Sequence, residues 1–356
     1  MLDRTSMDRP GVGRLAHAAP DHPHVPPAKV GVILANLGTP DATDYWSMRR
    51  YLSEFLSDKR VIEWPSALWQ PILQLIVLSK RPFSSGEAYR GIWNTERDES
   101  PLLTITRSQV EKLRSRLTAK AGTGVMVDFA MRYGNPSTPS VISKMQAAGC
   151  ERILFFPLYP QYAAATTGTA NDQAFRALMD LRWQPAVRTV PAYYDHPAYI
   201  EALARSVEHA YDAMEEKPTA LVTSYHGLPE SYFKKGDPYH CQCQKSTRLM
   251  RERLGWAKED VHTTFQSRFG PEEWLQPYTV EYVAKLASEG HKRIAVMAPG
   301  FSSDCVETLE EINEEIKEAF EHAGGEHFHY IPCLNDDQAH IEMIERIVLH
   351  ETQGWL

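Results

Sequence analysis

Apolar residues along this chain occur in short unbroken runs rather than in alternation with polar residues. The runs lie within residues 29–40 and at 126–131, 152–158, 186–190, 220–225, 261–266, 293–298 and 328–331. Unbroken runs of this length predict strands that are covered on both faces. Helical periodicity lies between most of them, for example at 104–119, 139–148, 171–181, 198–214 and 275–288. Strands that alternate with helices predict parallel sheets with right-handed crossovers.

The eight expected strands fall into two sets of four. They predict an α/β fold with two similar domains, each a mostly parallel four-stranded sheet flanked by helices. The boundary is expected near Pro191, giving domains at 29–190 and 191–356, and the last helix can pack back on the first domain. No sequence repeat accompanies this division. Residues 1–28 lack the apolar core of a signal peptide and are interpreted as a disordered arm.

Composition narrows the class of protein. At 356 residues, with 43% hydrophobic and 24% charged residues, the chain is typical of a soluble globular protein with room for two domains. A net charge of −8 without a basic repeat argues against a nucleic-acid partner. Five cysteines, an odd number in a long chain, do not form a disulfide framework, which favours a reducing compartment such as the cytoplasm.

The run at 293–298 ends at Pro299-Gly300, and a Ser-Ser-Asp turn then predicts the start of a helix. At about 100° per residue, carboxylates share one side of this helix and apolar residues share the other. The acidic side carries Asp304, Glu307, Glu311, Glu314, Glu315 and Glu318; the apolar side carries Val306, Leu309, Ile312, Ile316 and Phe320. Taken alone, the acidic side is more typical of a solvated face. The alternative is a ladder for a divalent cation or for protons at the end of a strand.

Three further strand ends carry candidate chemistry. His226 ends the run at 220–225, where an imidazole can accept a proton or bind a metal; a structural histidine is the alternative. Arg132 and Tyr133 follow the run at 126–131 and suit an anionic or aromatic ligand, unless the arginine only fixes its loop. Trp274 either belongs to the core or stacks on a flat ligand.

The segment 61–81 is rich in tryptophan and aliphatic residues and ends in Lys80-Arg81. It is too short to span a bilayer, but it can lie at a membrane surface with Trp64 and Trp69 at headgroup depth. A helix packed on the domain core is an equally good interpretation. Elsewhere, His240-Cys241-Gln242-Cys243 lacks the further ligands of a zinc or iron–sulfur site, and nucleotide-binding and G-x-S-x-G motifs are absent from the sequence.

Taken in order, these stretches resemble the ferrochelatase family. The matching motifs are LANLGTP at 34–40, MRYGNP at 131–136, FPLYPQY and TTG within 156–168, SYHGLP at 224–229, KGDPY at 235–239, FQSRFGPEEWL at 265–275 and PGFSSDCVETLEE at 299–311. They cover nearly the whole chain beyond the arm. The resemblance implies two Rossmann-like domains with a porphyrin cleft between them.

The resemblance also implies an activity and a set of site residues. The family inserts Fe²⁺ into protoporphyrin IX to form protohaem and releases two protons, which is the last step of haem biosynthesis. His226 and Glu307 would be the metal-binding and catalytic pair, and Glu311 and Asp304 would continue the acidic path. The substrate-binding residues would be Leu37, Arg132, Tyr133, Trp274 and Phe301. The rival interpretations are a coproporphyrin ferrochelatase or other tetrapyrrole metal chelatase, and a non-enzymatic haem or metal carrier.

Three departures from the family pattern qualify these expectations. Cys305 stands where many relatives have histidine; it could bind iron as a thiolate or simply pack. Residues 162–165 contain no cysteine and none lies near the end of the chain, so a 2Fe–2S cluster is not expected and no resident cofactor is required. A C-terminal extension that supports dimers in some relatives is also missing, which favours a monomer. We expect a cytoplasmic enzyme with peripheral membrane contact if 61–81 touches lipid.

Overall fold

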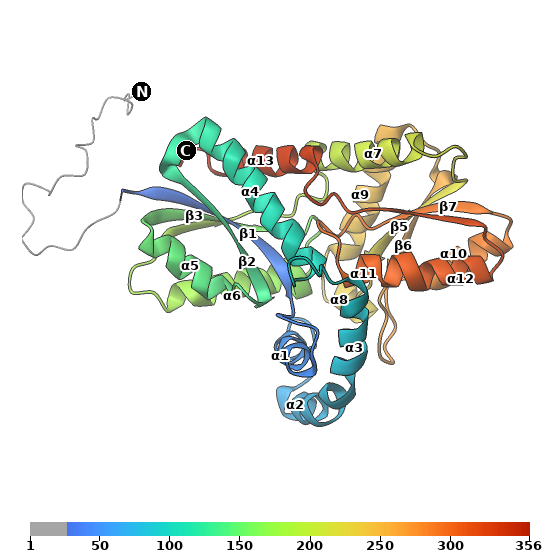
Figure 1. Ribbon diagram of the computed structural model, residues 1–356, viewed down its shortest axis with the longest axis horizontal. Helices are drawn as coiled ribbons and strands as arrows, with labels where there is room; N and C mark the ends of the chain where they lie inside the picture. Colours follow the sequence, from blue (N-terminus) through green and yellow to red (C-terminus); the bar gives the residue numbers. More distant parts are fainter. Residues whose placement is uncertain (1–26) are drawn as a thin grey trace, which may run out of the picture.

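Two four-stranded parallel sheets lie side by side in the computed structural model, which describes residues 27–356 (Figure 1). The first sheet has the order β2-β1-β3-β4 and consists of β1 (Lys29–Thr39), β2 (Val125–Gly134), β3 (Cys150–Pro157) and β4 (Ala186–Thr189). The second has the order β6-β5-β7-β8 and consists of β5 (Ala220–His226), β6 (Val261–Gln266), β7 (Arg293–Met297) and β8 (His327–Ile331). The predicted α/β class with two similar sheets is confirmed. The predicted arm at 1–28 lies almost wholly outside the described residues.

Helices cover both faces of each sheet (Figure 1). In the first half they are α1 (Tyr45–Leu56), α2 (Ser66–Ile72), the π-helical η1 (Leu73–Val77), α3 (Leu78–Ile92), α4 (Pro101–Ala121), the short η2 (Gly122–Gly124), α5 (Thr138–Ala147), the π-helical η3 (Ala164–Gly168) and α6 (Thr169–Met179). In the second half they are α7 (Pro197–Asp212), α8 (Glu230–Lys234), α9 (Tyr239–Leu254), the short η4 (Lys258–Asp260), α10 (Thr279–Ser288), α11 (Val306–Leu309), the π-helical η5 (Glu311–Ile316), α12 (Lys317–His322) and α13 (Gln338–Glu351). No helix within residues 27–356 is both long and apolar enough to cross a membrane.

Two expected helices differ from the sequence pattern. The helix expected at 275–288 begins only at Thr279, because the Leu275 N–H donates to the Leu228 carbonyl (2.9 Å) and holds this stretch extended. The acidic helix expected from residue 304 is divided into α11, η5 and α12. Its middle turn is wide, since the Glu315 N–H donates to the Glu310 carbonyl five residues earlier (3.2 Å).

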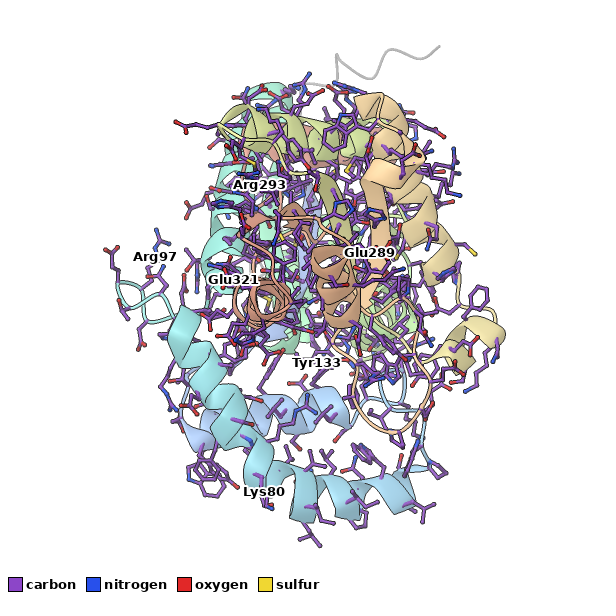
Figure 2. The ribbon with its side chains drawn as sticks, turned by 90° about the vertical axis from the view of Figure 1, so that its right-hand side faces the viewer. Lys80, Arg97, Tyr133, Glu289, Arg293 and Glu321 are labelled. Carbon is purple, nitrogen blue, oxygen red and sulfur yellow. The ribbon has the colours of Figure 1, made fainter. Side chains whose placement is uncertain are left out.

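α1, α2, η1 and α3 project below the two sheets (Figure 1), and Figure 2 shows Lys80 on this projecting part. We call residues 66–92 the α2–α3 hairpin. Its inner side is anchored on α1, where the Trp69 indole donates to the Leu56 carbonyl (2.6 Å) and Arg49 donates to the Leu78 carbonyl (2.7 Å). Leu73 and Leu78 of the hairpin are fully buried on this inner side. The sequence left two interpretations for 61–81, a helix packed on the domain core and a segment at a membrane surface. The inner side of the hairpin is packed, as the first interpretation expects.

α4 connects the two halves of the molecule. The buried Gln109 amide donates to the Ser303 hydroxyl (3.0 Å) and to the Asn335 carbonyl (2.8 Å), both in the second half. Further along α4, Arg116 and Lys120 pair with Glu345 of α13 at 2.8 and 2.9 Å. The last helix thus packs against a helix of the first half, and α4 sets how the two sheets face each other.

Glu345 makes this connection sensitive to pH. Its side chain is only 4% exposed, and burial alone would raise the pKa of its carboxyl. The hydrogen bonds from Lys120 and Arg116 outweigh burial, and the pKa of Glu345 lies below its ordinary value. A depressed pKa contributes stability above the unfolded-state pKa, and that stability is lost as pH falls through the folded-state value.

We predict that Glu345→Gln lowers the free energy of unfolding by about 1–2 kcal/mol at neutral pH, since the neutral amide pairs less well with the two cations. The difference between wild type and variant should shrink as the pH falls below the ordinary glutamate pKa of about 4.3, and it should disappear once the depressed pKa of the folded-state carboxyl is passed. Urea unfolding at several pH values measures both effects. A difference that grew on acidification would contradict the assignment.

Candidate functional site

A cavity of about 540 Å³ lies where the carboxyl ends of the two sheets face each other. Its lining residues follow β1, β3, β5, β6 and β7, and others come from α1 and the α2–α3 hairpin. This is the edge at which open α/β sheets hold ligands, and the volume is that of a small-molecule site. The sheets thus bring segments from both halves of the sequence to one cavity.

Most of the cavity wall is apolar. Leu37 at the end of β1 and Phe301 after β7, both named by the family resemblance, line it from opposite halves. Aromatic and aliphatic side chains complete the wall; they include Tyr51, Phe55, Leu56, Tyr89, Leu228, Phe269 and Val306. Such a wall suits a large, flat and largely apolar ligand.

His226 lines the cavity at the end of β5. Its Nδ1 lies 2.7 Å from the Gly227 carbonyl oxygen. Because a carbonyl oxygen can only accept, Nδ1 carries the proton and Nε2 keeps the free lone pair. His226 is thereby held in the tautomer that can take up a proton or bind a metal through Nε2.

Trp274 lines the same part of the cavity and is 5% exposed. A β-carbon at residue 227 would lie 3.0 Å from its ring and 2.7 Å from the Gln266 carbonyl, so only glycine allows the tryptophan to pack this closely. The Trp274 Nε1–H has no hydrogen-bond partner within the described part of the chain. The indole therefore forms a buried part of the cavity wall next to Gly227 and the end of β5.

Glu311 is the most strongly held carboxylate of the cavity. The Ser267 N–H and hydroxyl each donate to it at 2.6 Å, and the Gln266 amide adds a bond of 3.1 Å. Ser267 adopts a left-handed backbone conformation (φ 63°) that directs both donors to Glu311. Burial, opposed in part by these bonds and by nearby His226, raises the pKa of Glu311. Its charge state is thus balanced between burial and hydrogen bonding.

The carboxylates of this helix do not divide as a regular helix would place them. Glu307, Glu310, Glu311 and Glu315 all line the cavity. Glu315 belongs to the acidic side that the sequence pattern predicts, whereas Glu310 does not. Burial, followed by repulsion from the neighbouring glutamates, raises the pKa of Glu310 to about 7. The ladder therefore includes a group that can exchange protons near neutral pH.

Asp304 does not reach the cavity. It is 6% exposed, and its carboxylate accepts hydrogen bonds from Tyr330 (2.5 Å), Thr308 (3.0 Å) and the Asn335 amide (2.6 Å). These bonds join the loop after β7 to the loop after β8. The structure thus places Asp304 in a supporting position beneath the acidic ladder.

Arg132 and Tyr133 also lie behind the wall rather than in it. Both side chains bind Asp58, the tyrosine hydroxyl at 2.9 Å, and Arg132 also donates to the Thr169 hydroxyl (2.6 Å). The Tyr133 ring packs at 5.0 Å against Phe55, which does line the cavity. The prediction that these two residues contact a ligand directly finds no support in the cavity lining.

Two arginines that the sequence did not single out line the cavity. Arg81 comes from the α2–α3 hairpin and lies over the Phe269 ring (5.6 Å), and Arg268 lies over the Tyr278 ring (4.5 Å). Burial lowers the pKa of Arg81, while the charge of Glu307 acts in the opposite direction. The Lys80-Arg81 pair at the end of the 61–81 segment was the available sequence signal.

Cys305 lines the cavity next to the glutamates and is 6% exposed. Burial, followed by the charge of Glu307, raises the pKa of this thiol well above its ordinary value. A thiol in this environment stays protonated, and a protonated thiol is a poor metal ligand. The geometry therefore favours packing over iron binding for Cys305. Among residues 27–356, no three His, Cys, Asp or Glu side chains converge as a preformed metal site.

Comparison with known proteins identifies relatives over nearly the whole chain. The family model described as Ferrochelatase matches residues 29–352. Ferrochelatase of Rhodobacter capsulatus is 65% identical over 343 residues, which cover 96% of this chain and 98% of that protein. Ferrochelatase of Agrobacterium fabrum (strain C58 / ATCC 33970) is 61% identical over 336 residues, covering 94% and 97%.

A solved structure shares the fold at low sequence identity. SirB from Bacillus subtilis, determined with Fe³⁺, is 12% identical, with a TM-score of 0.53 over 92% of this chain and 97% of that one. At this identity the similarity supports the two-sheet fold alone.

We predict that Ser267→Ala raises the pKa of Glu311 further, because the variant loses a donor to the charged carboxylate while burial is unchanged. Titration of ¹³C-labelled glutamate side chains by NMR measures the change. Ser84→Ala is the matched control, since Ser84 also lines the cavity but donates to the Arg81 carbonyl. An unchanged or lower pKa in the Ser267 variant would show that its hydroxyl does not stabilise the ionised form.

Proposed function

Because this chain belongs to the ferrochelatase family, we propose that it inserts Fe²⁺ into protoporphyrin IX to form protohaem. The protein is a metal chelatase of haem biosynthesis. The observation that carries the finer assignment is one cavity in which an apolar aromatic wall meets His226, Glu307 and Glu311. The wall suits a macrocycle, and the polar groups suit a divalent cation and the protons it displaces.

The arginines support protoporphyrin as the macrocycle. Among the described residues that line the cavity, the permanent cations are Arg81 and Arg268. Protoporphyrin carries two propionates and coproporphyrin four, so two arginines match the former. In the proposed complex the propionates face these arginines and the pyrrole nitrogens face His226 and the glutamates. The negative propionates then lie away from the negative glutamates.

Insertion requires that two pyrrole N–H protons leave as the metal enters. His226 accepts a proton through Nε2, which its bond to Gly227 leaves free. Glu307 presents the metal, and Glu311, Glu310 and Glu315 form the path along the helix by which protons leave or the cation arrives. Glu310, with a pKa of about 7, suits repeated proton uptake and release. Asp304 serves as a positioning residue for this helix.

A flat porphyrin holds its nitrogen lone pairs in the ring plane, so insertion is easier when the ring is bent. Contacts from the apolar wall, remote from the nitrogens, can stabilise the bent form. Leu37, Trp274 and Phe301 line the cavity from different segments. Tyr133, held by Asp58, supports Phe55 from behind, and Arg132 shares the same carboxylate. The proposal thus gives Arg132 and Tyr133 an indirect role in substrate binding.

The α2–α3 hairpin supports contact with a membrane surface. Its outer side exposes apolar residues, namely Trp64 just before it and Leu68, Leu75, Ile76 and Phe83 on it, each between 48% and 75% exposed. Its inner side lines the cavity at Arg81 and Ala88. An apolar substrate can then pass between lipid and cavity along one structural element. We propose a monomeric, peripherally bound cytoplasmic enzyme.

The proposal includes no 2Fe–2S cluster. Cys150 begins β3, Cys241 and Cys243 lie on α9, and Cys305 and Cys333 lie near the acidic ladder. Burial raises the pKa of Cys150, Cys243, Cys305 and Cys333, which disfavours the thiolates that a cluster needs.

We expect the purified protein to metallate protoporphyrin IX with Fe²⁺ under anaerobic conditions, and to do so faster than coproporphyrin. Loss of the free-porphyrin absorption bands measures both rates, and the protein alone should show no visible band from a cluster. Faster metallation of coproporphyrin would overturn the substrate assignment. Binding of haem without any metallation would favour a carrier.

We predict that His226→Ala lowers the rate of insertion by about 100-fold or more, the usual range for loss of a general base. Protoporphyrin binding, followed by fluorescence quenching, should remain, because the apolar wall is intact. His322→Ala is the control, since His322 is exposed at the end of α12. Unchanged insertion by the His226 variant would remove it from the mechanism.

A further inference from the structure

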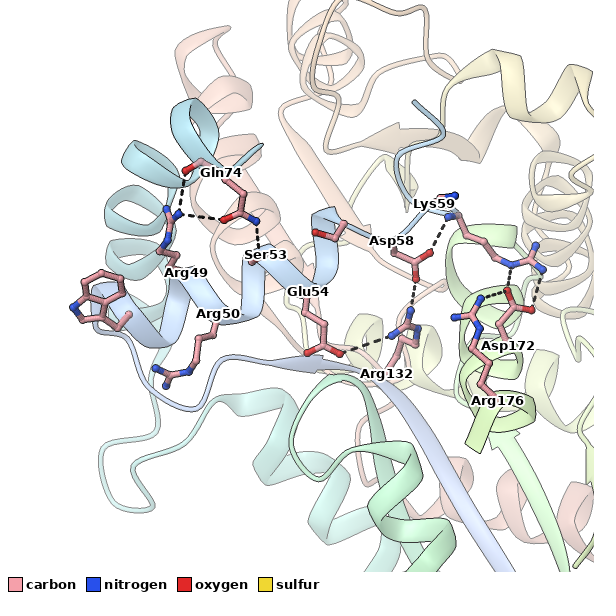
Figure 3. A pocket seen from close by; sticks show the side chains of 13 residues that line it. Arg49, Arg50, Ser53, Glu54, Asp58, Lys59, Gln74, Arg132, Asp172 and Arg176 are labelled. Carbon is pink, nitrogen blue, oxygen red and sulfur yellow. Dashed lines mark hydrogen bonds and ion pairs between the residues drawn. The ribbon is translucent and has the colours of Figure 1, made fainter. Parts of the chain in front are cut away.

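A second depression, larger than the cavity, lies along α1, and Figure 3 shows the residues that line it. Its volume is about 1130 Å³, and it is bounded by α1, the turn at 57–60, Gln74 of η1 and residues 172–176 of α6. It shares no lining residue with the cavity, because α1 turns Tyr51, Phe55 and Leu56 toward the cavity instead. We call it the basic groove after its cations, which are Arg49, Arg50, Lys59, Arg60, Arg132 and Arg176.

Carboxylates compensate only half of these cations. Asp172 pairs with Arg60 (2.6 Å) and Arg176 (3.7 Å), as Figure 3 shows, and Arg132 pairs with Asp58 and more distantly with Glu54. With six cations and three carboxylates in the lining, the groove carries an excess of three positive charges. This excess stands out in a chain whose net charge is −8.

The excess charge is concentrated along α1 and the turn that follows it. Arg49 donates to the carbonyls of Gln74 and Leu78 and Arg50 to the Ser47 hydroxyl, while Lys59 has no side-chain hydrogen bond or ion pair within the described part of the chain. Arg50 and Lys59 are exposed. Their charges are therefore free to meet an anion from solution.

Exposed apolar residues border the groove. Trp46, in its lining, is 65% exposed, and Gln74 leads directly to Leu75 and Ile76, which are 75% and 63% exposed. Arg49 ties the groove to the α2–α3 hairpin through its bonds to two hairpin carbonyls. One continuous surface thus presents apolar side chains next to uncompensated cations, the pattern of surfaces that bind anionic lipid.

We propose that the basic groove binds the phosphate headgroup of an acidic phospholipid while the outer side of the hairpin enters the apolar layer. This rests on the membrane contact proposed above and adds the lipid class. Arg50 and Lys59 supply charge, and Trp46 lies at the level between headgroup and acyl chain, where tryptophan is favoured. The bound headgroup holds the hairpin, and with it the cavity mouth, against the lipid.

The test is sedimentation of the full chain with vesicles of phosphatidylcholine alone or with phosphatidylglycerol added. The double variant R50Q/K59Q should lose roughly 30-fold in partitioning onto the acidic vesicles, since each basic residue contributes about fivefold. Partitioning onto neutral vesicles should not change. The control is R97Q/K258Q, in which both residues are exposed and lie outside the groove. It should lose at most a small, non-specific part of the binding.

A second pair of measurements separates the groove from the hairpin and from the reaction. The variant with Leu75→Asp and Ile76→Asp should weaken binding to both kinds of vesicle. R50Q/K59Q should metallate detergent-dispersed porphyrin at the wild-type rate, because only its lipid binding is lost. Equal binding of wild type and R50Q/K59Q to acidic vesicles would overturn the proposal. It would also be overturned if soluble glycerol phosphate bound the groove while vesicle binding stayed independent of it.

Discussion

A carboxylate that leaves water needs hydrogen bonds or cations around it, and this requirement fixes the loops on both sides of the cavity. In the first half, burial raises the pKa of Asp58, but the hydrogen bonds it accepts and the charge of Arg132 outweigh burial and leave the pKa below its ordinary value. In the second half, Asp304 joins the loops after β7 and β8 through Tyr330 and Asn335. The cavity walls are therefore positioned before a ligand arrives. Glu311 follows the same rule, but its donors leave it at the cavity surface.

Much of this arrangement could be predicted from the sequence. Unbroken apolar runs predict both sheets, because strands buried on two faces have few other residue choices. Strand ends meet at one edge of a parallel sheet, so His226 and the acidic helix that carries Glu307 could be expected near one site without knowledge of distances. The resemblance to the ferrochelatase family added Leu37 and Phe301 and favoured a ligand contact for Trp274, and all five residues line the cavity.

The remaining differences have physical causes that a pattern does not contain. A strand end does not reveal where a side chain finds its partner, and Asp58, far away in sequence, holds Arg132 and Tyr133 behind the wall. A period of 100° per residue leaves Glu310 off the acidic side, but the wide turn of the π-helical η5 accompanies a geometry in which Glu310 lines the cavity together with Glu315. Arg81 ends a segment that is mostly apolar, and the pattern of that segment does not show that the arginine side chain faces the cavity.

In the proposed reaction, the glutamates that line the cavity link metal entry to proton release. Burial, followed by repulsion from the neighbouring glutamates, raises the pKa of Glu310 to about 7, so this group can hold a proton near neutral pH at the cavity wall. A divalent cation that enters this cluster favours the ionised carboxylates and so lowers their pKa. The cation thereby expels protons from the path that the pyrrole protons must use. When the metal moves on into the macrocycle, the glutamates regain their affinity for protons, and they can then accept those that leave the ring.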